Sequence, residues 1–263
     1  TAFLNFHDNP VSDTDVAGND NTGLTTDKIG TLPFGKIALT SSYTIEYIEG
    51  SMMAMQGKTK FQISITDPSN SDAPVPAATV MLMPMMYMAT KSHSTPVDGQ
   101  CQEGATGVYD CTVYYVMASM GGYWDLKVMS NGEEAHFYPE VMMAMGDTAV
   151  TMLRNSNLTM NMMGEIKVRT FQTFKSSLTG TTGDHTFELF TTTMETMMSF
   201  PAVYTDAVLN AATPNELTIN PMQVLVSTDP AFVTDVYTAT EDGNGYWTAA
   251  GITGLTNSVE GTL

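Results

Sequence analysis

The sequence predicts an all-β protein: two related Ig-like β-sandwich domains that follow an irregular N-terminal extension. From residue 36 onward, short runs with alternating or β-branched residues are separated by clusters of Pro, Gly, Asn and Asp. No segment longer than about a dozen residues keeps the helical period of 3.6, so long helices are not expected. The clearest strand-like runs are Lys36–Thr40, Tyr43–Ile48, Lys60–Thr66, Ala78–Met83, Tyr109–Met117 and Tyr123–Val128.

A short repeated pattern suggests that the two domains are related. Met120-Gly121-Gly122-Tyr123-Trp124 parallels Gly243-Asn244-Gly245-Tyr246-Trp247, and each follows a strand-like run. A glycine turn before Tyr-Trp predicts a hairpin whose return strand points the indole into the core. In looser register, the run from Gly57 to Ile63 resembles the run from Gly183 to Leu189. We expect an acidic extension over 1–34, a first sandwich over 35–155 and a second over 164–263.

The charge balance excludes some partners and favours others. Ten Lys and Arg stand against 28 Asp and Glu, for a net charge of −18. Such a field repels nucleic acid and anionic membrane surfaces and attracts cations. Only 14% of the residues are charged, and much of the polarity comes from Thr, Ser and Asn. This composition is typical of an exported protein, periplasmic, extracellular or on the cell surface.

Two further features bear on export and on membranes. The chain opens at Thr1 with no charged-then-apolar leader, which favours a processed form. The longest apolar run, Val80 to Ala89, contains Pro84 and is too short to span a bilayer. We therefore expect no membrane span.

The two cysteines, Cys101 and Cys111, lie in a turn-rich stretch and predict a disulfide. Closing this short loop would stabilise the fold by roughly 2–3 kcal/mol in the chain-entropy model. The alternative is a metal site with two thiolates, but no C-x-x-C spacing is present and no His lies between the cysteines. A disulfide also agrees with an oxidising compartment.

Methionine accounts for 22 of the 263 residues and is clustered along the chain. A thioether is a soft, uncharged ligand that suits Cu(I), but it is also a flexible filler of irregular cores. Two segments share the spacing M-M-x-M, at residues 52–55 and 142–145, and residues 81–88 hold five methionines. Exposure decides between the alternatives, since buried clusters belong to a core and exposed ones are ligands or contact surfaces.

The first domain resembles a known family over about residues 55–130. The segment 78–88 contains Pro84-Met85-Met86-Tyr87-Met88, the next strand begins Gly107-Val108-Tyr109, and 117–128 reads Met-Ala-Ser-Met-Gly-Gly-Tyr-Trp-Asp-Leu-Lys-Val. These motifs are similar to those of the YtkA-like/FixH-like family of exported domains. The resemblance implies an Ig-like β-sandwich and an association with copper handling or copper-oxidase assembly. The second domain keeps only the Gly-Tyr-Trp part.

A copper site is expected where the main methionine cluster meets the Gly121-Gly122 turn. In a strand, Met81, Met83 and Met85 would share one face, while Val80 and Leu82 take the other. We expect the chain to turn past Pro84, so that Met85, Met86 and Met88 converge with Met117 or Met120. The predicted Cu(I) ligands are Met85, Met88 and Met120, with His93 as a fourth, and the alternative is that these methionines only fill a core.

Asp13, Asp15 and Asp20 surround Gly18 closely enough to wrap Ca²⁺ with the help of backbone carbonyls. The alternative is a solvated acidic segment, and the closing Glu of an EF-hand loop is missing. Asn157 begins a glycosylation sequon whose use depends on the host. No G-x-S-x-G, phosphate-binding loop or dinucleotide motif is present, so we expect no enzyme.

Two functions follow from these patterns. The first is an exported protein that carries or sequesters copper, chiefly Cu(I), without transforming a substrate. The second is a cell-surface or filament-forming structural protein, in which residues 1–34 add a strand to a neighbouring subunit and Ca²⁺ bridges acidic loops. Methionine clusters that are exposed beside a histidine would favour copper, and clusters buried between chains would favour assembly.

Overall fold

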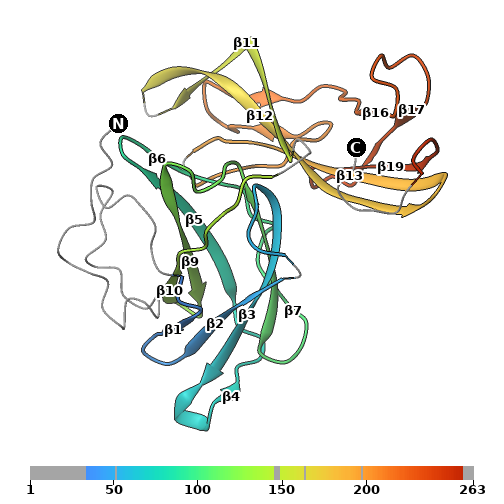
Figure 1. The fold of residues 1–263 in the computed structure, drawn as a ribbon. Helices are drawn as coiled ribbons and strands as arrows, with labels where there is room; N and C mark the ends of the chain where they lie inside the picture. The colour runs from blue at the N-terminus through green and yellow to red at the C-terminus, as the bar shows by residue number, and fades with distance from the viewer. Residues whose placement is uncertain (1–33, 51, 145–148, 163, 197, 257–263) are drawn as a thin grey trace. The chain divides into compact units, whose positions relative to one another are not determined.

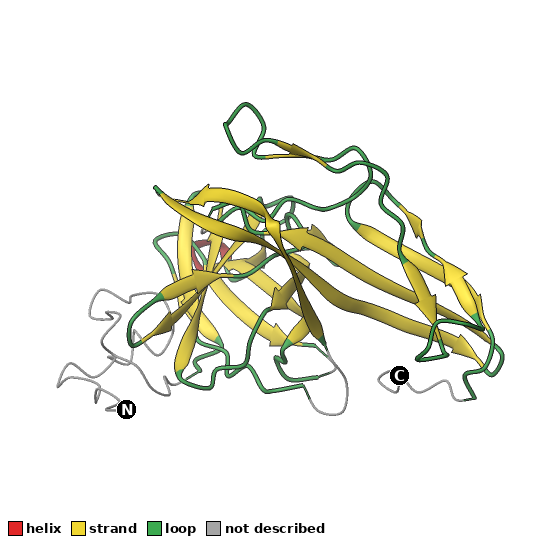
Figure 2. Ribbon diagram, turned by 90° about the horizontal axis from the view of Figure 1, so that it is seen from above, coloured by secondary structure: helices red, strands yellow, loops and turns green. Residues whose placement is uncertain are grey.

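The computed structural model describes residues 34–50, 52–144, 149–162, 164–196 and 198–256. These residues form antiparallel sheets, and the predicted all-β, sandwich-like fold is confirmed (Figure 2). Within the described ranges, the one helical element is the 3₁₀ turn Pro68–Asn70, and no helix is long and apolar enough to cross a membrane. The N-terminal extension, with Asp13, Asp15 and Asp20, lies outside the described residues.

The chain divides into two compact units between Met143 and Ala144. This division precedes the boundary that we expected near 155–164. The reason is that strand β11 runs from Val150 to Met162 and pairs with β12 on both sides of a register shift between Arg154 and Thr159, so the expected linker is part of a long hairpin.

The first unit is a sandwich of two sheets (Figure 1). Tyr47 of one sheet lies 5.9 Å from Phe137 of the other, and Tyr115 lies 4.9 Å from Trp124, measured between ring centroids. One sheet has the order β1-β2-β3-β8-β7, with β4 beside β3, and the other has the order β10-β9-β5-β6. The strands are β1 (Ile37–Leu39), β2 (Thr44–Glu49), β3 (Gly57–Asp67), β4 (Ala73–Pro74), β5 (Val80–Met88), β6 (Ser92–Ser94), β7 (Gln102–Glu103), β8 (Val108–Tyr115), β9 (Gly122–Ser130) and β10 (Glu133–Phe137).

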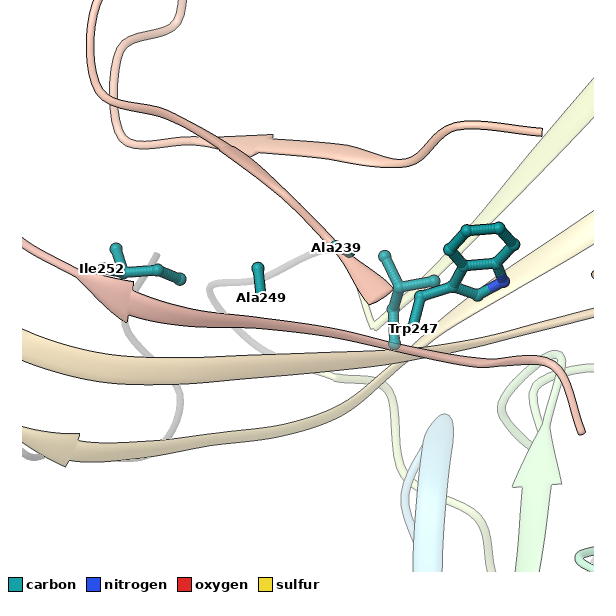
Figure 3. Close-up of a cluster of buried hydrophobic side chains, with 5 residues drawn as sticks. Ala239, Trp247, Ala249 and Ile252 are labelled. Atoms are coloured by element: carbon teal, nitrogen blue, oxygen red, sulfur yellow. The ribbon is translucent and has the colours of Figure 1, made fainter. Parts of the chain in front are cut away.

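The second unit contains a five-stranded sheet of order β11-β12-β13-β19-β18 and two pairs, β14-β15 and β16-β17. Its core gathers on one face of β19, from which Trp247, Ala249 and Ile252 project beside Ala239 (Figure 3). The strands are β11 (Val150–Met162), β12 (Glu165–Thr181), β13 (Asp184–Thr193), β14 (Val208–Leu209), β15 (Leu217–Thr218), β16 (Leu225–Ser227), β17 (Val236–Thr238), β18 (Thr240–Glu241) and β19 (Tyr246–Ile252).

The larger sheet of each unit has the same topology. In each sheet, three strands that are consecutive in the sequence lie side by side. The last strand in the sequence pairs with the third of these, and the strand that precedes it in the sequence lies at the edge of the sheet. Strand β3 therefore corresponds to β13, β8 to β19 and β7 to β18. The register agrees as well, since Ile63 faces Tyr109 where Leu189 faces Trp247. This correspondence supports the weaker of the two sequence likenesses, the one between the runs that begin at Gly57 and Gly183.

The Gly-Tyr-Trp likeness relates strands that are not equivalent. Trp124 and Trp247 are both buried, but β9 pairs with β5 and β10 in the smaller sheet, whereas β19 belongs to the larger one. The chain crosses between sheets at Gly121, so the hairpin that we expected between β8 and β9 is wrong. The true counterpart of Gly245-Tyr246-Trp247 is Gly107-Val108-Tyr109.

Hydrogen bonds show how closely these two segments match. The Gly107 carbonyl accepts from Ile65 N, and the Gly245 carbonyl accepts from Thr191 N. Both glycines have positive φ, which a residue with a side chain would adopt only under strain. The Tyr109 hydroxyl donates to the Val75 carbonyl at 2.7 Å, and Trp247 Nε1 donates to the Val203 carbonyl at 3.2 Å.

Glu103 and Glu241 also correspond. Glu103 lies opposite Tyr109 and accepts from Ala77 N, while Glu241 lies opposite Trp247 and accepts from Thr205 N. The shared sequence signature is therefore Glu, three residues, Gly, one residue and an aromatic.

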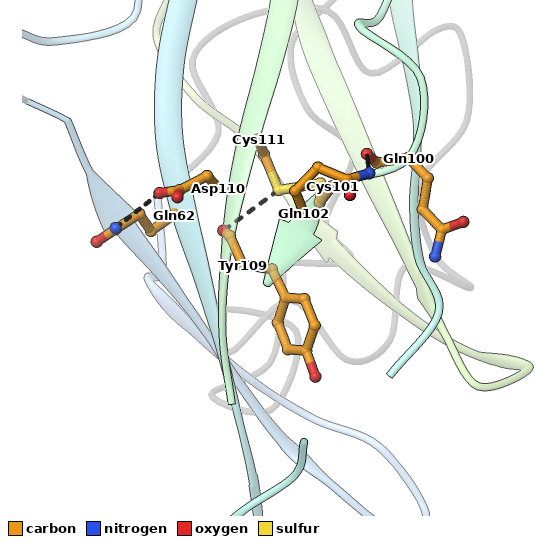
Figure 4. Close-up of a disulfide and its surroundings, with 7 residues drawn as sticks. All are labelled: Gln62, Gln100, Cys101, Gln102, Tyr109, Asp110 and Cys111. Atoms are coloured by element: carbon orange, nitrogen blue, oxygen red, sulfur yellow. Dashed lines mark hydrogen bonds between the residues drawn. A yellow bond between two sulfur atoms is a disulfide. The ribbon is translucent and has the colours of Figure 1, made fainter. Parts of the chain in front are cut away.

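The disulfide between Cys101 and Cys111 is confirmed, with the two Cα atoms 4.6 Å apart (Figure 4). It joins the start of the β7 segment to β8 in the first unit. In the aligned second unit, Ala239 and Ala249 occupy these two positions. Cys111 faces Phe61 as Ala249 faces Phe187, and both alanines are buried.

Candidate metal site

The inner face of the smaller sheet brings one histidine and two methionines together. Met86 on β5 lies directly opposite His93 on β6 and opposite Trp124 on β9. Side chains directly opposite each other in antiparallel strands share a face and lie in contact. Met117 reaches this row from the segment that follows β8, and its Sδ lies 3.1 Å from His93 Nε2.

Strand β5 can hold this geometry because it runs straight through Pro84. The turn that we expected past Pro84 is wrong: β5 continues to Met88. Proline is tolerated there because β6 pairs only with Met85–Tyr87, so at Pro84 only one side of β5 is paired. The expected alternation is confirmed, with Val80 and Leu82 buried and Met81 and Met83 on the other face.

The hydrogen bonds of His93 fix which nitrogen can act as a ligand. Nδ1 lies 3.0 Å from the carbonyl oxygen of Ser94, which can only accept, so in the neutral ring Nδ1 carries the hydrogen. The lone pair of Nε2 then faces the Met117 sulfur, which is at best a weak acceptor. Two soft lone-pair donors converge with no hydrogen between them, and this arrangement suits a metal ion.

Burial keeps the imidazole neutral. Desolvation lowers the pKa of His93 below its ordinary value, and the charge of Lys91 acts in the same direction, while the hydrogen bond to Ser94 opposes both. A neutral ring is the form that coordinates metals. The lowered pKa therefore leaves Nε2 available at neutral pH.

Trp124 closes the site on the core side. Its indole is fully buried, donates from Nε1 to the Met117 carbonyl at 3.1 Å, and meets the His93 ring edge-on at 5.5 Å between centroids. The backbone hydrogen bond holds Met117 in place, and the ring keeps water from that side. Met86 is also fully buried, whereas His93 and Met117 are half-buried and reachable.

The structure places the predicted ligands in different surroundings. Met85 lies on the opposite face of β5 from Met86, across from Ser94 and Asp125. Met88 shares the face of Met86 and lies opposite Gly122, while Met120 is 69% exposed in the turn before β9. The sulfur atom that lies within hydrogen-bonding distance of His93 Nε2 belongs to Met117, which is not among the three predicted methionines.

Ligand sets for harder cations would draw on acidic and histidine side chains. Among the described residues, no group of three or more His, Cys, Asp or Glu side chains is placed to hold a metal ion. The calcium ligands expected at Asp13, Asp15 and Asp20 lie outside that part of the chain. Strands β9 and β10 have no counterpart in the described part of the second unit, so among the described residues the row of Met86, His93 and Trp124 occurs only in the first unit.

No protein-family model, curated protein or solved structure matches this chain.

Proposed function

We propose that this protein binds Cu(I) through His93 and Met117, with Met86 as a third ligand, and carries or sequesters the metal outside the cytoplasm. The observation that carries the proposal is the approach of His93 Nε2 to Met117 Sδ at 3.1 Å, in a tautomer that leaves the nitrogen lone pair facing sulfur. Imidazole and thioether together favour Cu(I) over hard cations such as Mg²⁺ or Ca²⁺.

Three further properties support a carrier. The net charge of −18 attracts cations from solution. The disulfide and the scarcity of basic residues agree with an exported protein. The half-buried position of His93 and Met117 leaves a path for the metal to enter and leave. No nucleophile or acid–base pair is part of the site, and we propose binding without catalysis.

A competition titration with a Cu(I) chelator, without oxygen, tests the proposal. Changing Met117 to Leu keeps the side-chain volume but removes the sulfur. Mutating residues that only hydrogen-bond to metal ligands commonly lowers metal affinity by about 10–100-fold. Losing a ligand itself should therefore weaken Cu(I) binding at least about 10-fold. His93→Ala should weaken it further. Circular dichroism and thermal unfolding check that each variant is folded.

Met85→Leu is the matched control, because it makes the same chemical change on the opposite face of β5. It should bind Cu(I) as tightly as the parent chain. If Met85→Leu and Met117→Leu weaken binding equally, the site is not where we place it. If the parent chain competes for no Cu(I), the proposed function is wrong.

A second candidate function, self-assembly as a structural protein, is favoured by the β11–β12 hairpin. This hairpin carries Arg154, Lys167 and Lys175 outside the core, while Arg169 is buried and donates to Asn210. Glu165 is its one acidic residue, and the chain beyond Lys175 contains no Lys or Arg. Exposed apolar side chains accompany the charges, at Leu153, Ile166 and Val168. We propose that the hairpin docks on the acidic surface of a second copy, and sedimentation at increasing salt tests it.

A further inference from the structure

The two M-M-x-M segments, far apart in the sequence, lie side by side at one end of the first unit. Met55 and Met142 form a parallel bridge. Met142 N donates to the Ala54 carbonyl at 2.9 Å, and Gln56 N donates to the Met142 carbonyl at 2.8 Å. The backbone thus holds the end of the first motif against the start of the second. Met145 lies outside the described residues.

Most of these methionines face solvent. Met52 is 66% exposed, Met53 63%, Met142 43% and Met143 53%, while Met55 is half-buried. Exposed, unbranched thioether side chains contribute little to a core, so the role of core filler does not explain them. Their side chains are open to solvent. We call Met52, Met53, Met142 and Met143 the exposed methionine cluster.

Hydrogen bonds tie this cluster to the segment that carries Met117. Ser119 N donates to the Val141 carbonyl at 2.8 Å, and Val141 N donates to the Ser119 hydroxyl at 2.9 Å. Gln56 Nε2 donates to the Val116 carbonyl at 3.2 Å. Residues 54–56, 116–119 and 141–142 are therefore bound together, and the exposed cluster lies at the same end of the unit as the Met117 segment and the exposed Met120.

We propose that the exposed methionine cluster is a second Cu(I) site, which captures the metal and passes it to His93 and Met117. This proposal rests on the proposed function for its destination, although the cluster can bind metal without it. Neutral thioethers on flexible, solvated side chains make a weaker site than one that a half-buried imidazole preorganises. The metal therefore moves from weak to strong ligands. Each transfer step exchanges one neutral ligand for another, so copper stays Cu(I) and no proton is released.

Labelling the methionine methyl carbons with ¹³C makes the binding visible by NMR, because a sulfur that coordinates Cu(I) shifts the resonance of its own methyl group. We expect a titration without oxygen to shift Met117 first, in slow exchange. The methyl groups of the exposed cluster should shift after the tight site is filled. Single Met→Leu variants assign the signals.

The decisive variant changes Met52, Met53, Met142 and Met143 together to Leu. It should lose the weak Cu(I) equivalents, keep the tight one, and load that tight site more slowly from a chelated donor. The control changes three other exposed methionines to Leu, Met81 on β5 and Met152 and Met198 of the second unit. It should keep both binding phases.

The outcomes separate this inference from the proposed function. If only the methyl resonances of the exposed cluster shift in the parent chain, and His93→Ala does not change these shifts, the cluster is a metal site and the His93 site is rejected. A single tight phase that is identical in the parent and in the fourfold variant would overturn the cluster. If the fourfold variant changes only the sedimentation of the protein and not its metal binding, the cluster is a contact surface and the inference is wrong.

Discussion

At the scale of single residues, the site depends on which atoms face each other, and sequence alone does not contain that information. Residue type is enough to select His93 and the clustered methionines as candidate ligands. The prediction of Met85 and Met120 depends on a turn past Pro84, whereas Met86 lies opposite His93 because of strand register. Met86 and Met117 are among the methionines expected to converge, but nothing in their spacing distinguishes them from their neighbours. Register depends on pairing between distant segments, which spacing does not reveal.

The state of His93 leads to a prediction about pH. Its pKa is lowered by burial, so the ring stays neutral as pH falls from 8 to the ordinary histidine value of about 6.5. Thioethers do not titrate in this range. Cu(I) affinity should therefore be constant over neutral pH and should fall only once pH drops through the lowered pKa, by up to about tenfold per pH unit for one competing proton.

Competition titrations between pH 5 and 8 check this prediction, with His93→Ala as the control. The variant should bind more weakly and show no such decline. An affinity that already falls steeply between pH 8 and 7 would mean that another, more basic group binds the metal.

At the scale of strands, the sequence predicts which segments form strands better than it predicts which strands pair or correspond between the two units. Alternation along residues 80–85 places Met81 and Met83 on the face of β5 opposite to the buried Val80 and Leu82. The disulfide follows from the presence of two cysteines. The likeness between the two Gly-Tyr-Trp motifs is misleading because the two tryptophans lie on strands that are not equivalent, β9 in the smaller sheet of the first unit and β19 in the larger sheet of the second. What the two units share is a side-chain hydrogen bond to an equivalent backbone carbonyl. In the first unit the Tyr109 hydroxyl donates to the Val75 carbonyl, and in the second the Trp247 indole donates to the Val203 carbonyl.

The equivalence of Cys101 and Cys111 with Ala239 and Ala249 is testable by design. Changing both alanines to cysteine should form a disulfide in the second unit, because the backbone there repeats the strand register of the first. A loop of this length should stabilise that unit by roughly 2–3 kcal/mol. Urea unfolding with and without a reducing agent measures the gain.

Single variants serve as controls, since Ala239→Cys or Ala249→Cys alone should gain nothing from oxidation. Two thiols that stay reactive in the oxidised double variant would show that the units differ in local geometry despite their shared topology.

At the scale of the whole molecule, charge is distributed unevenly. The acidic composition disfavours nucleic acid as a partner on electrostatic grounds, and this stays a prediction from the sequence. The sequence also contains the basic segment between Arg154 and Lys175, but its meaning depends on the fold. Only the pairing of β11 with β12 shows that these charges share one hairpin with exposed apolar side chains.

The form of any self-association is constrained by that hairpin. Strand β11 is an edge strand that, among the described residues, pairs only with β12. Its register shifts between Arg154 and Thr159, where the residues in between bulge out of the ladder. A bulge on an edge strand opposes continuous strand addition. Contact with a second copy should therefore use side chains and charge.

Such an interaction should depend on salt. The screening length shortens from about 10 Å at 0.1 M salt to about 3 Å at 1 M, so association between the basic hairpin and an acidic surface should weaken strongly over this range. Changing Arg154 and Lys167 to Glu should abolish it at low salt. Changing Lys60 and Lys91 to Glu alters net charge by the same amount on the first unit, and should leave more of the association intact. Sedimentation velocity at several concentrations measures all three proteins, and a parent chain that stays monomeric at low salt and high concentration would reject docking between copies.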